Sequence, residues 1–289
     1  MANMNFPTSF PAQVQERHPG IESEMNPRPI FKANGYNVIG EKLKNKIAVI
    51  TGGDSGIGRA VAYAFSKHGA KVNILYFDED VDALETKSII ESEGGECNLY
   101  KGDIANEQYC ISVIDEIGKK YGNIDILVNN SAVQYSKNSI DQIDTDQMLR
   151  TFEVNVFANF YLSKASLKYM TSGASIINTS SVTAFHGHKT LIDYSSTKGA
   201  ITSLTRSLSM NLADKGIRVN AVAPGPIWTP LIPSSFTLEE VSTFGSQTPM
   251  KRAGQPVEVA GAYVFLASDE ASFITGQTIH INGGEIVNA

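Results

Sequence analysis

The chain has 289 residues, of which 42% are hydrophobic and 19% are charged, as in a globular protein and unlike a disordered or fibrous one. Its 24 basic and 30 acidic residues leave a formal charge of −6, which argues against a nucleic acid or an anionic membrane as a partner. The sequence contains no apolar run of about 18 residues that could span a membrane, and no secretory signal opens it. The two cysteines, Cys97 and Cys110, predict neither a disulfide framework nor a metal site, so we expect a reduced, cytoplasmic protein.

The segment 1–40 differs from the rest of the chain. Five prolines stand among polar residues, and because proline fixes φ and removes a backbone donor, no helical or alternating pattern survives. We therefore expect an extended, irregular segment. Its apolar residues leave two interpretations open, a disordered tail and an arm on a neighbouring subunit; they are Ile21, Met25, Ile30, Phe31 and Tyr36.

From residue 41 to 289, short β-branched runs alternate with segments of helical spacing. The expected strands are 46–50, 71–77, 125–130, 174–181, 217–224 and 277–283, and clear helical patterns cover 58–69 and 107–122. Such alternation produces βαβ units with right-handed crossovers and a parallel sheet that is buried on both faces. We predict a single α/β domain over 41–289, a Rossmann-type doubly wound parallel sheet with helices on both faces.

The first expected strand runs directly into a glycine-rich turn, 51–58, and a helix follows. The N-terminus of a helix offers unpaired N–H groups and a partial positive charge, which favour a pyrophosphate. Gly52 would permit the tight turn, Gly56 a close approach of the ligand, and Gly58 close packing of helix on strand. The turn is not a P-loop, because no Gly-Lys-Ser/Thr follows it.

Tyr194 and Lys198 are four residues apart in an expected helix that ends near Asp214, so both lie on one helical face. A lysine beside a phenol stabilises the phenolate and lowers the tyrosine pKa from about 10 towards neutral pH. Such a phenol suits proton transfer in an alcohol–carbonyl interconversion. Ser181 follows an expected strand, and Asn155 lies in the long helix before it.

With these motifs the chain resembles the classical short-chain dehydrogenase/reductase family from about Leu43 to Glu285, and most closely its bacterial general-stress and glucose-dehydrogenase-like members with an N-terminal extension. The glycine turn has the family's T-G-x-x-x-G-x-G spacing. The family's Asn–Ser–Tyr–Lys tetrad is matched in order by Asn155, Ser181, Tyr194 and Lys198. The resemblance implies that Tyr194 transfers the proton and that Ser181 hydrogen-bonds the substrate oxygen. It implies that Lys198 binds the nicotinamide ribose and lowers the Tyr194 pKa, that Asn155 holds a relay water, and that no metal takes part.

The resemblance also implies which residues contact the dinucleotide. Asp103, after the third strand, would meet the adenine, and the segment that starts at Pro224 would lie over the nicotinamide. Ala132 stands where the family has glycine, which narrows the space beside the cofactor. The expected set is Gly52, Asp54, Ser55, Gly56, Ile57, Gly58, Tyr76, Phe77, Asp103, Ile104, Asn129, Ser131, Ala132, Thr179, Tyr194, Lys198, Pro224, Gly225, Ile227 and Thr229.

The residues after the second expected strand favour NAD over NADP. A ribose 2′-OH prefers a carboxylate partner, whereas a 2′-phosphate prefers a cation. No basic residue stands at Ser55, Tyr76 or Phe77, and the acidic run 78–80 would repel a phosphate. Arg59, the nearest cation, is expected on the pyrophosphate side.

The segment 226–250 is punctuated by proline and serine and follows the nicotinamide segment, so we predict a mobile lid over the substrate. The other expected pocket residues suggest a ligand of mixed polarity; they are Gln134, Tyr135, His186, His188, Leu191 and Ile192. Near the C-terminus, more apolar residues occur than one helix buries alone, and the resemblance implies a homotetramer that packs there; these residues are Val259, Tyr263, Val264, Phe265 and Leu266.

The sequence thus predicts an oxidoreductase that transfers a hydride between a nicotinamide cofactor and a secondary alcohol or carbonyl substrate. A catalytically idle NAD-binding sensor or scaffold is an alternative, although it predicts a broken tetrad. A hydrolase or dehydratase on the same fold is disfavoured by the intact Tyr194–Lys198 pair. No Gly-x-Ser-x-Gly motif frames Ser180 or Ser181, which argues against acyl transfer.

Overall fold

The computed structural model describes residues 6–33, 36 and 40–287. Seven parallel strands form one sheet in the order β3-β2-β1-β4-β5-β6-β7. The strands are β1 (Ile47–Thr51), β2 (Lys71–Tyr76), β3 (Glu96–Lys101), β4 (Ile126–Asn129), β5 (Ser175–Thr179), β6 (Arg218–Pro224) and β7 (Thr278–Ile281). The predicted doubly wound parallel sheet is confirmed, and its strand order reverses between β1 and β4.

All six expected strands are present, and β3 is the strand that the runs of β-branched residues did not reveal. Its sequence, ECNLYK, is mostly polar because β3 lies at the edge of the sheet and is only partly buried. β5 ends at Thr179, two residues earlier than expected, so Ser181 lies beyond the strand in the segment that leads into the next helix.

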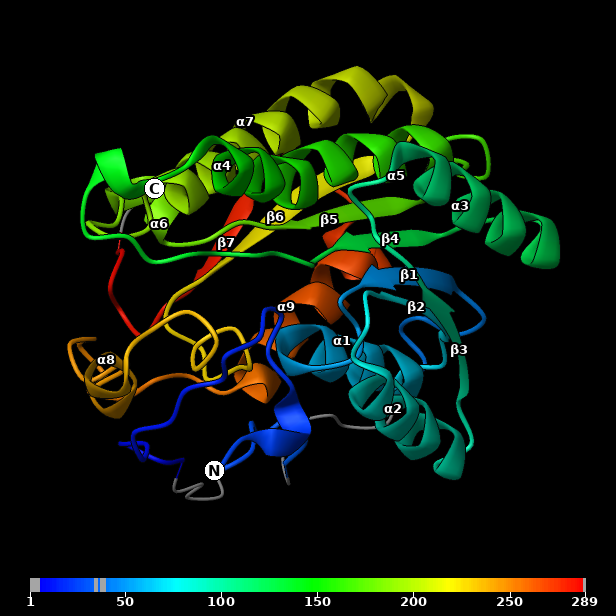
Figure 1. Ribbon diagram of the computed structural model, residues 1–289. Helices are drawn as coiled ribbons and strands as arrows, with labels where there is room; N and C mark the ends of the chain where they lie inside the picture. Colours follow the sequence, from blue (N-terminus) through cyan, green and yellow to red (C-terminus); the bar gives the residue numbers. More distant parts are fainter. Residues whose placement is uncertain (1–5, 34–35, 37–39, 288–289) are drawn as a thin grey trace.

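Helices cover both faces of the sheet (Figure 1). One layer contains α1 (Gly56–Lys67), α2 (Asp80–Ser92) and α9 (Pro256–Ala267), and the other contains α3 (Glu107–Tyr121), α4 (Thr145–Phe152), α5 (Ala158–Ser166) and α7 (Ile192–Leu212). Shorter helices are α6 (Thr183–His186) and α8 (Leu238–Ser242), and a π-helical turn, η3 (Glu153–Phe157), joins α4 to α5. The 3-10 turns are η1 (Glu22–Glu24), η2 (Ile140–Gln142), η4 (Ala213–Lys215) and η5 (Asp269–Ala271). Among the described residues, no helix combines the length and the apolar character that crossing a membrane requires.

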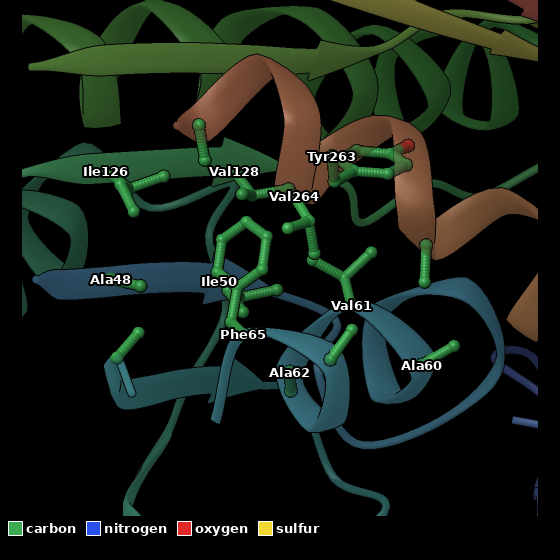
Figure 2. Packing of buried hydrophobic residues seen from close by; sticks show 14 of the residues in the cluster. Ala48, Ile50, Ala60, Val61, Ala62, Phe65, Ile126, Val128, Tyr263 and Val264 are labelled. Carbon is green, nitrogen blue, oxygen red and sulfur yellow. The ribbon is translucent and has the colours of Figure 1, made fainter. Parts of the chain in front are cut away.

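The core beneath α1 and α9 buries the apolar residues that we expected at a subunit contact. Figure 2 shows Phe65 of α1 and Val264 of α9 packed with Ile50 of β1. Small residues on both helices, such as Ala60 and Ala260, allow α1 and α9 to pack closely. Most of the C-terminal apolar residues are therefore buried within the chain, and they do not by themselves indicate an oligomer.

Residues 6–33 lie against their own chain, which differs from both interpretations of the segment 1–40; residues 1–5, 34–35 and 37–39 lie outside the described residues. The ring of Phe10 stacks on that of Trp228, with centroids 3.9 Å apart. Ile21 and Met25 are buried, and the Ile30 carbonyl accepts a hydrogen bond from the Val257 N–H at 3.0 Å. We call residues 6–33 the N-terminal arm.

Candidate active site

A cavity of about 330 Å³ opens at the carboxyl ends of the strands, where the sheet order reverses. Such a switch point is where doubly wound sheets bind their ligands. Most of the expected cofactor residues line it: Gly52, Asp54, Ser55, Gly56, Ile57, Tyr76, Phe77, Asp103, Ile104, Ser131, Ala132, Thr179, Tyr194, Lys198, Pro224, Gly225, Ile227 and Thr229. Gly58 and Asn129 do not line it.

The glycine turn between β1 and α1 needs glycine for steric reasons. Gly52 has φ +62°, and a Cβ there would lie 2.9 Å from the Ser131 Oγ. A Cβ on Gly58 would lie 1.8 Å from the Gly52 carbonyl oxygen, so this glycine serves helix packing and not ligand contact. Ser55 precedes α1 without capping it through its side chain. The turn and the start of α1 therefore form a cradle whose shape fits the phosphates of a dinucleotide.

One N–H of this cradle is already bonded within the chain. The Gly56 N–H donates to the carboxylate of Glu22 in the N-terminal arm at 2.5 Å, and Glu22 also pairs with Arg59 at 2.6 Å. Arg59 is buried and does not line the cavity, so its expected place on the pyrophosphate side is wrong. Arg59 instead anchors the N-terminal arm.

Asn129 is a structural residue. Its side chain is buried, and its Nδ2 donates to the Asn178 Oδ1 at 2.9 Å, which ties β4 to β5. Asn130 lines the cavity in its place, and its Nδ2 donates to the Thr51 carbonyl at 3.1 Å. The identical neighbouring residue types explain why the sequence did not separate the two roles.

Tyr194 and Lys198 come from successive turns of α7, and both side chains line the cavity. The Lys198 Nζ lies 5.4 Å from the centre of the Tyr194 ring and donates to the Thr179 carbonyl at 2.8 Å. Ser181, beyond the end of β5, also lines the cavity, and its Oγ accepts a hydrogen bond from the Thr183 Oγ1 at 3.1 Å. The structure thus brings together three members of the expected tetrad.

The protonation of the pair differs from the expectation. Burial raises the pKa of Tyr194 to about 12, although the Ser181 hydroxyl acts in the opposite direction. Burial also lowers the pKa of Lys198 to about 7. The pKa of Tyr194 is therefore shifted in the direction opposite to the one expected. Loss of solvent disfavours both the phenolate and the ammonium, and the Lys198 amine donates its hydrogen bond to the Thr179 carbonyl and not to the phenol.

Asn155, the fourth member, lies in the π-helical turn η3 and does not line the cavity. Its Oδ1 accepts from the Val133 N–H at 2.8 Å, and its Nδ2 donates to the Val133 carbonyl at 2.9 Å and to the Thr197 Oγ1 at 3.1 Å. The amide is thus engaged with protein atoms, and the expected relay water stays a prediction. The amide holds the loop after β4 against α7.

The other end of the cavity contains most of the expected substrate residues. Gln134, Tyr135, His186, His188 and Leu191 line it, whereas Ile192 does not. The segment 226–250 contributes apolar side chains and forms α8, which begins with a capping box between Thr237 and Glu240. That this segment moves stays a prediction.

The sequence missed several residues of the cavity wall: His18, Pro19, Gly20, Arg150 and Glu285. The first three belong to the N-terminal arm, where no motif marks them. Arg150 on α4 pairs with Asp103 at 2.7 Å, and its guanidinium lies 5.6 Å from the centre of the Phe77 ring. This pairing joins residues 47 positions apart, which no local pattern predicts.

Two buried carboxyl groups line the cavity beyond β1 and β2. Burial raises the pKa of Asp54 to about 6. It also raises the pKa of Glu79 to about 7, and Asp54 adds to that effect. This part of the wall therefore offers carboxyl groups.

The parallel sheet, the glycine cradle and the polar residues at the switch point define an oxidoreductase of the nicotinamide-dinucleotide-binding class. The chain belongs to the short-chain dehydrogenase/reductase family, since a family model described as enoyl-(acyl carrier protein) reductase matches residues 52–285. The predicted membership is confirmed.

Relatives and solved structures are similar over most of their length. General stress protein 39 of Bacillus subtilis is 53% identical, with 98% of this chain and 99% of that protein covered. NADPH-dependent aldehyde reductase 1 of Arabidopsis thaliana and glucose and ribitol dehydrogenase of Daucus carota are 49% and 48% identical, each with 96% of this chain and 98% of the relative covered. A short-chain dehydrogenase of Burkholderia cenocepacia in complex with NADP has a TM-score of 0.79 and 29% identity, with 84% of this chain and 98% of that chain covered.

Proposed function

We propose that this protein interconverts a carbonyl compound and the corresponding alcohol, with Tyr194 as the group that transfers the proton. The observation that carries the proposal is the position of Tyr194, Ser181 and Lys198 on one wall of the switch-point cavity. The bound nicotinamide cofactor would supply a hydride to the carbonyl carbon, or accept one from the alcohol carbon. The intact set of Tyr194, Ser181 and Lys198 argues against an idle sensor or scaffold.

The protein residues would orient the substrate and balance its charge. Ser181 would donate a hydrogen bond to the substrate oxygen, and Tyr194 would give its phenolic proton to that oxygen as the alcohol forms. In the reverse direction, Tyr194 would take the proton back. Lys198 would hold the nicotinamide ribose, and Asn155 would fix the loop that carries Val133 and Gln134.

We propose NAD as the preferred cofactor. The carboxyl groups of Asp54 and Glu79 on the cavity wall suit a ribose 2′-OH and disfavour a 2′-phosphate. Arg150 is the cation that would favour NADP, but it is paired with Asp103. Two comparisons favour NADP instead, namely the relative named as NADPH-dependent and the similar structure in complex with NADP.

We also propose a homotetramer in the cytoplasm. The contact surface that the structure favours is not α9 but the helical stretch α4–η3–α5, where Met148, Leu149, Phe157 and Phe160 are exposed. Contiguous exposed apolar side chains mark subunit contacts. The buried thiols of Cys97 and Cys110 are consistent with a reducing compartment.

The proposed activity is tested by following oxidation of NADH and NADPH with a panel of aldehydes, ketones and sugars. We expect turnover with NADH, and kcat/KM for NADH at least about tenfold above that for NADPH. A tenfold preference for NADPH would contradict the cofactor assignment, and no turnover with any carbonyl would contradict the activity.

A further inference from the structure

The N-terminal arm is fixed to the chain on both sides of His18. Before it, Phe10 stacks on Trp228, and the Gln15 N–H donates to the Pro233 carbonyl at 2.8 Å. After it, the buried carboxylate of Glu22 holds the Gly56 N–H and Arg59. Because both ends are anchored by buried contacts, residues 18–20 have a defined place.

That place is the wall of the cavity, at its substrate end. The His18 Nε2 accepts a hydrogen bond from the Gln134 N–H at 3.3 Å, and its ring centre lies 4.8 Å from that of Tyr135. The Ser234 backbone is also beside the imidazole, but its geometry falls short of a hydrogen bond to Nδ1. His18 thus joins the N-terminal arm to the loop after β4.

The backbone of the N-terminal arm leaves no space against that segment. A Cβ on Gly20 would lie 2.4 Å from the Pro230 carbonyl oxygen, and both residues line the cavity. The N-terminal arm precedes the residues that the family model matches, 52–285. Residues 18–20 therefore add to this wall from outside the part of the chain that the family model matches.

Gln134 brings an unused polar group to the same place. It is only 4% exposed and lines the cavity, yet its side-chain amide has no hydrogen-bond partner in residues 6–33, 36 and 40–287. Its amide atoms keep contact with solvent, so the group faces the cavity and is free to bond what occupies it. A ligand group that both donates and accepts hydrogen bonds would match the amide, and a hydroxyl group does both.

We propose that His18 and Gln134 form a subsite for a hydroxyl group of the substrate, and that the N-terminal arm thereby selects carbonyl compounds that carry a further hydroxyl group. The proposal rests on the proposed function. His18 acts as a positioning residue, since its imidazole fixes the backbone of Gln134, while the Gln134 amide contacts the ligand. The substrate class is that of hydroxyaldehydes, hydroxyketones and the corresponding polyols.

The test compares D-glyceraldehyde with propanal, which has the same three-carbon chain but no hydroxyl group. We expect Gln134→Leu to lower the ratio of kcat/KM for glyceraldehyde to kcat/KM for propanal at least about tenfold, mainly through KM, as the loss of one buried hydrogen bond predicts. His18→Ala should lower the ratio in the same direction. Glu16→Ala, an exposed change in the same arm, is the control and should keep the wild-type ratio.

A ratio within about twofold of wild type in Gln134→Leu would overturn the subsite, even if both rates fall, because damage to the fold reduces both rates together. Binding of ribitol to the NADH-loaded protein, measured by calorimetry, gives a second result independent of turnover. Weaker ribitol binding in Gln134→Leu supports the subsite, and equal binding overturns it. Failure of the wild type to reduce either aldehyde would overturn the proposed activity instead.

Discussion

Tyr194 and Lys198 are both buried in the cavity wall, and their protonation is governed by loss of solvent more than by each other. A phenol with a raised pKa keeps its proton at neutral pH, and this is the form needed to donate to a developing alkoxide. The residue pattern predicted that both groups lie on one helical face, and both line the cavity, but spacing along a helix does not report desolvation. The direction of the Tyr194 pKa shift therefore required the three-dimensional surroundings.

This direction has a consequence for the pH dependence. Because Tyr194 has a pKa of about 12, its donor form is almost fully populated from about pH 8 to about pH 10, a range that lies above the pKa of Lys198 at about 7. We expect kcat/KM for aldehyde reduction to be flat over this range, and kcat/KM for alcohol oxidation to rise with pH as phenolate accumulates. The measurement is a pair of pH profiles in one buffer series. A reduction rate that falls about tenfold per unit between pH 8 and pH 10 would show a phenol pKa near or below 8.

At the scale of elements, the π-helical turn η3 explains why Asn155 is outside the cavity. The Asn155 side chain forms hydrogen bonds with both the N–H and the carbonyl of Val133. Through these bonds η3 sets the position of the loop after β4. Helical periodicity places Asn155 in a helix but does not reveal a π-turn or a partner 22 residues away. In the same way, the polar edge strand β3 lacked the β-branched run that identifies buried strands.

Removal of the Asn155 amide should destabilise the protein as a whole. Asn155→Leu keeps the side-chain size but leaves the Val133 N–H and carbonyl without this partner in a buried place. We expect the free energy of unfolding to fall by about 2–4 kcal/mol. Urea denaturation measures it, and Asn138→Ala in an exposed turn is the control, with a change below about 0.5 kcal/mol. Equal effects of the two substitutions would contradict the assigned role.

For the whole molecule, the βα alternation was sufficient to predict the parallel sheet and its class, and the family resemblance implied most of the residues that line one part of the cavity. The N-terminal arm was not predictable, because His18 and Glu22 act through contacts with residues 116 and 34 positions away. Its apolar residues were correctly noticed, but their partner is the same chain. The apolar residues of α9 do not support the expected subunit contact for the same reason, since they pack against α1.

The proposed tetramer depends on the exposed apolar stretch α4–η3–α5. Phe160 is 50% exposed near its centre, so Phe160→Glu should bury an unpaired charge in the contact and dissociate the assembly. Sedimentation velocity measures the species. Val81→Glu on α2, where the side chain is 64% exposed, is the control and should leave the tetramer intact. A monomeric wild type, or a Phe160→Glu protein that sediments as the wild type does, would contradict this contact.

The most direct test of the account is a single turnover of bound NADH in the wild type and in Tyr194→Phe, followed by the absorbance of NADH after mixing with an aldehyde. Both proteins should bind NADH with the same affinity, since the substitution removes one oxygen. The wild type should oxidise the bound NADH rapidly, and Tyr194→Phe should do so about 100 to 10,000 times more slowly. Oxidation at the wild-type rate in Tyr194→Phe would contradict the assignment of Tyr194 as the proton donor.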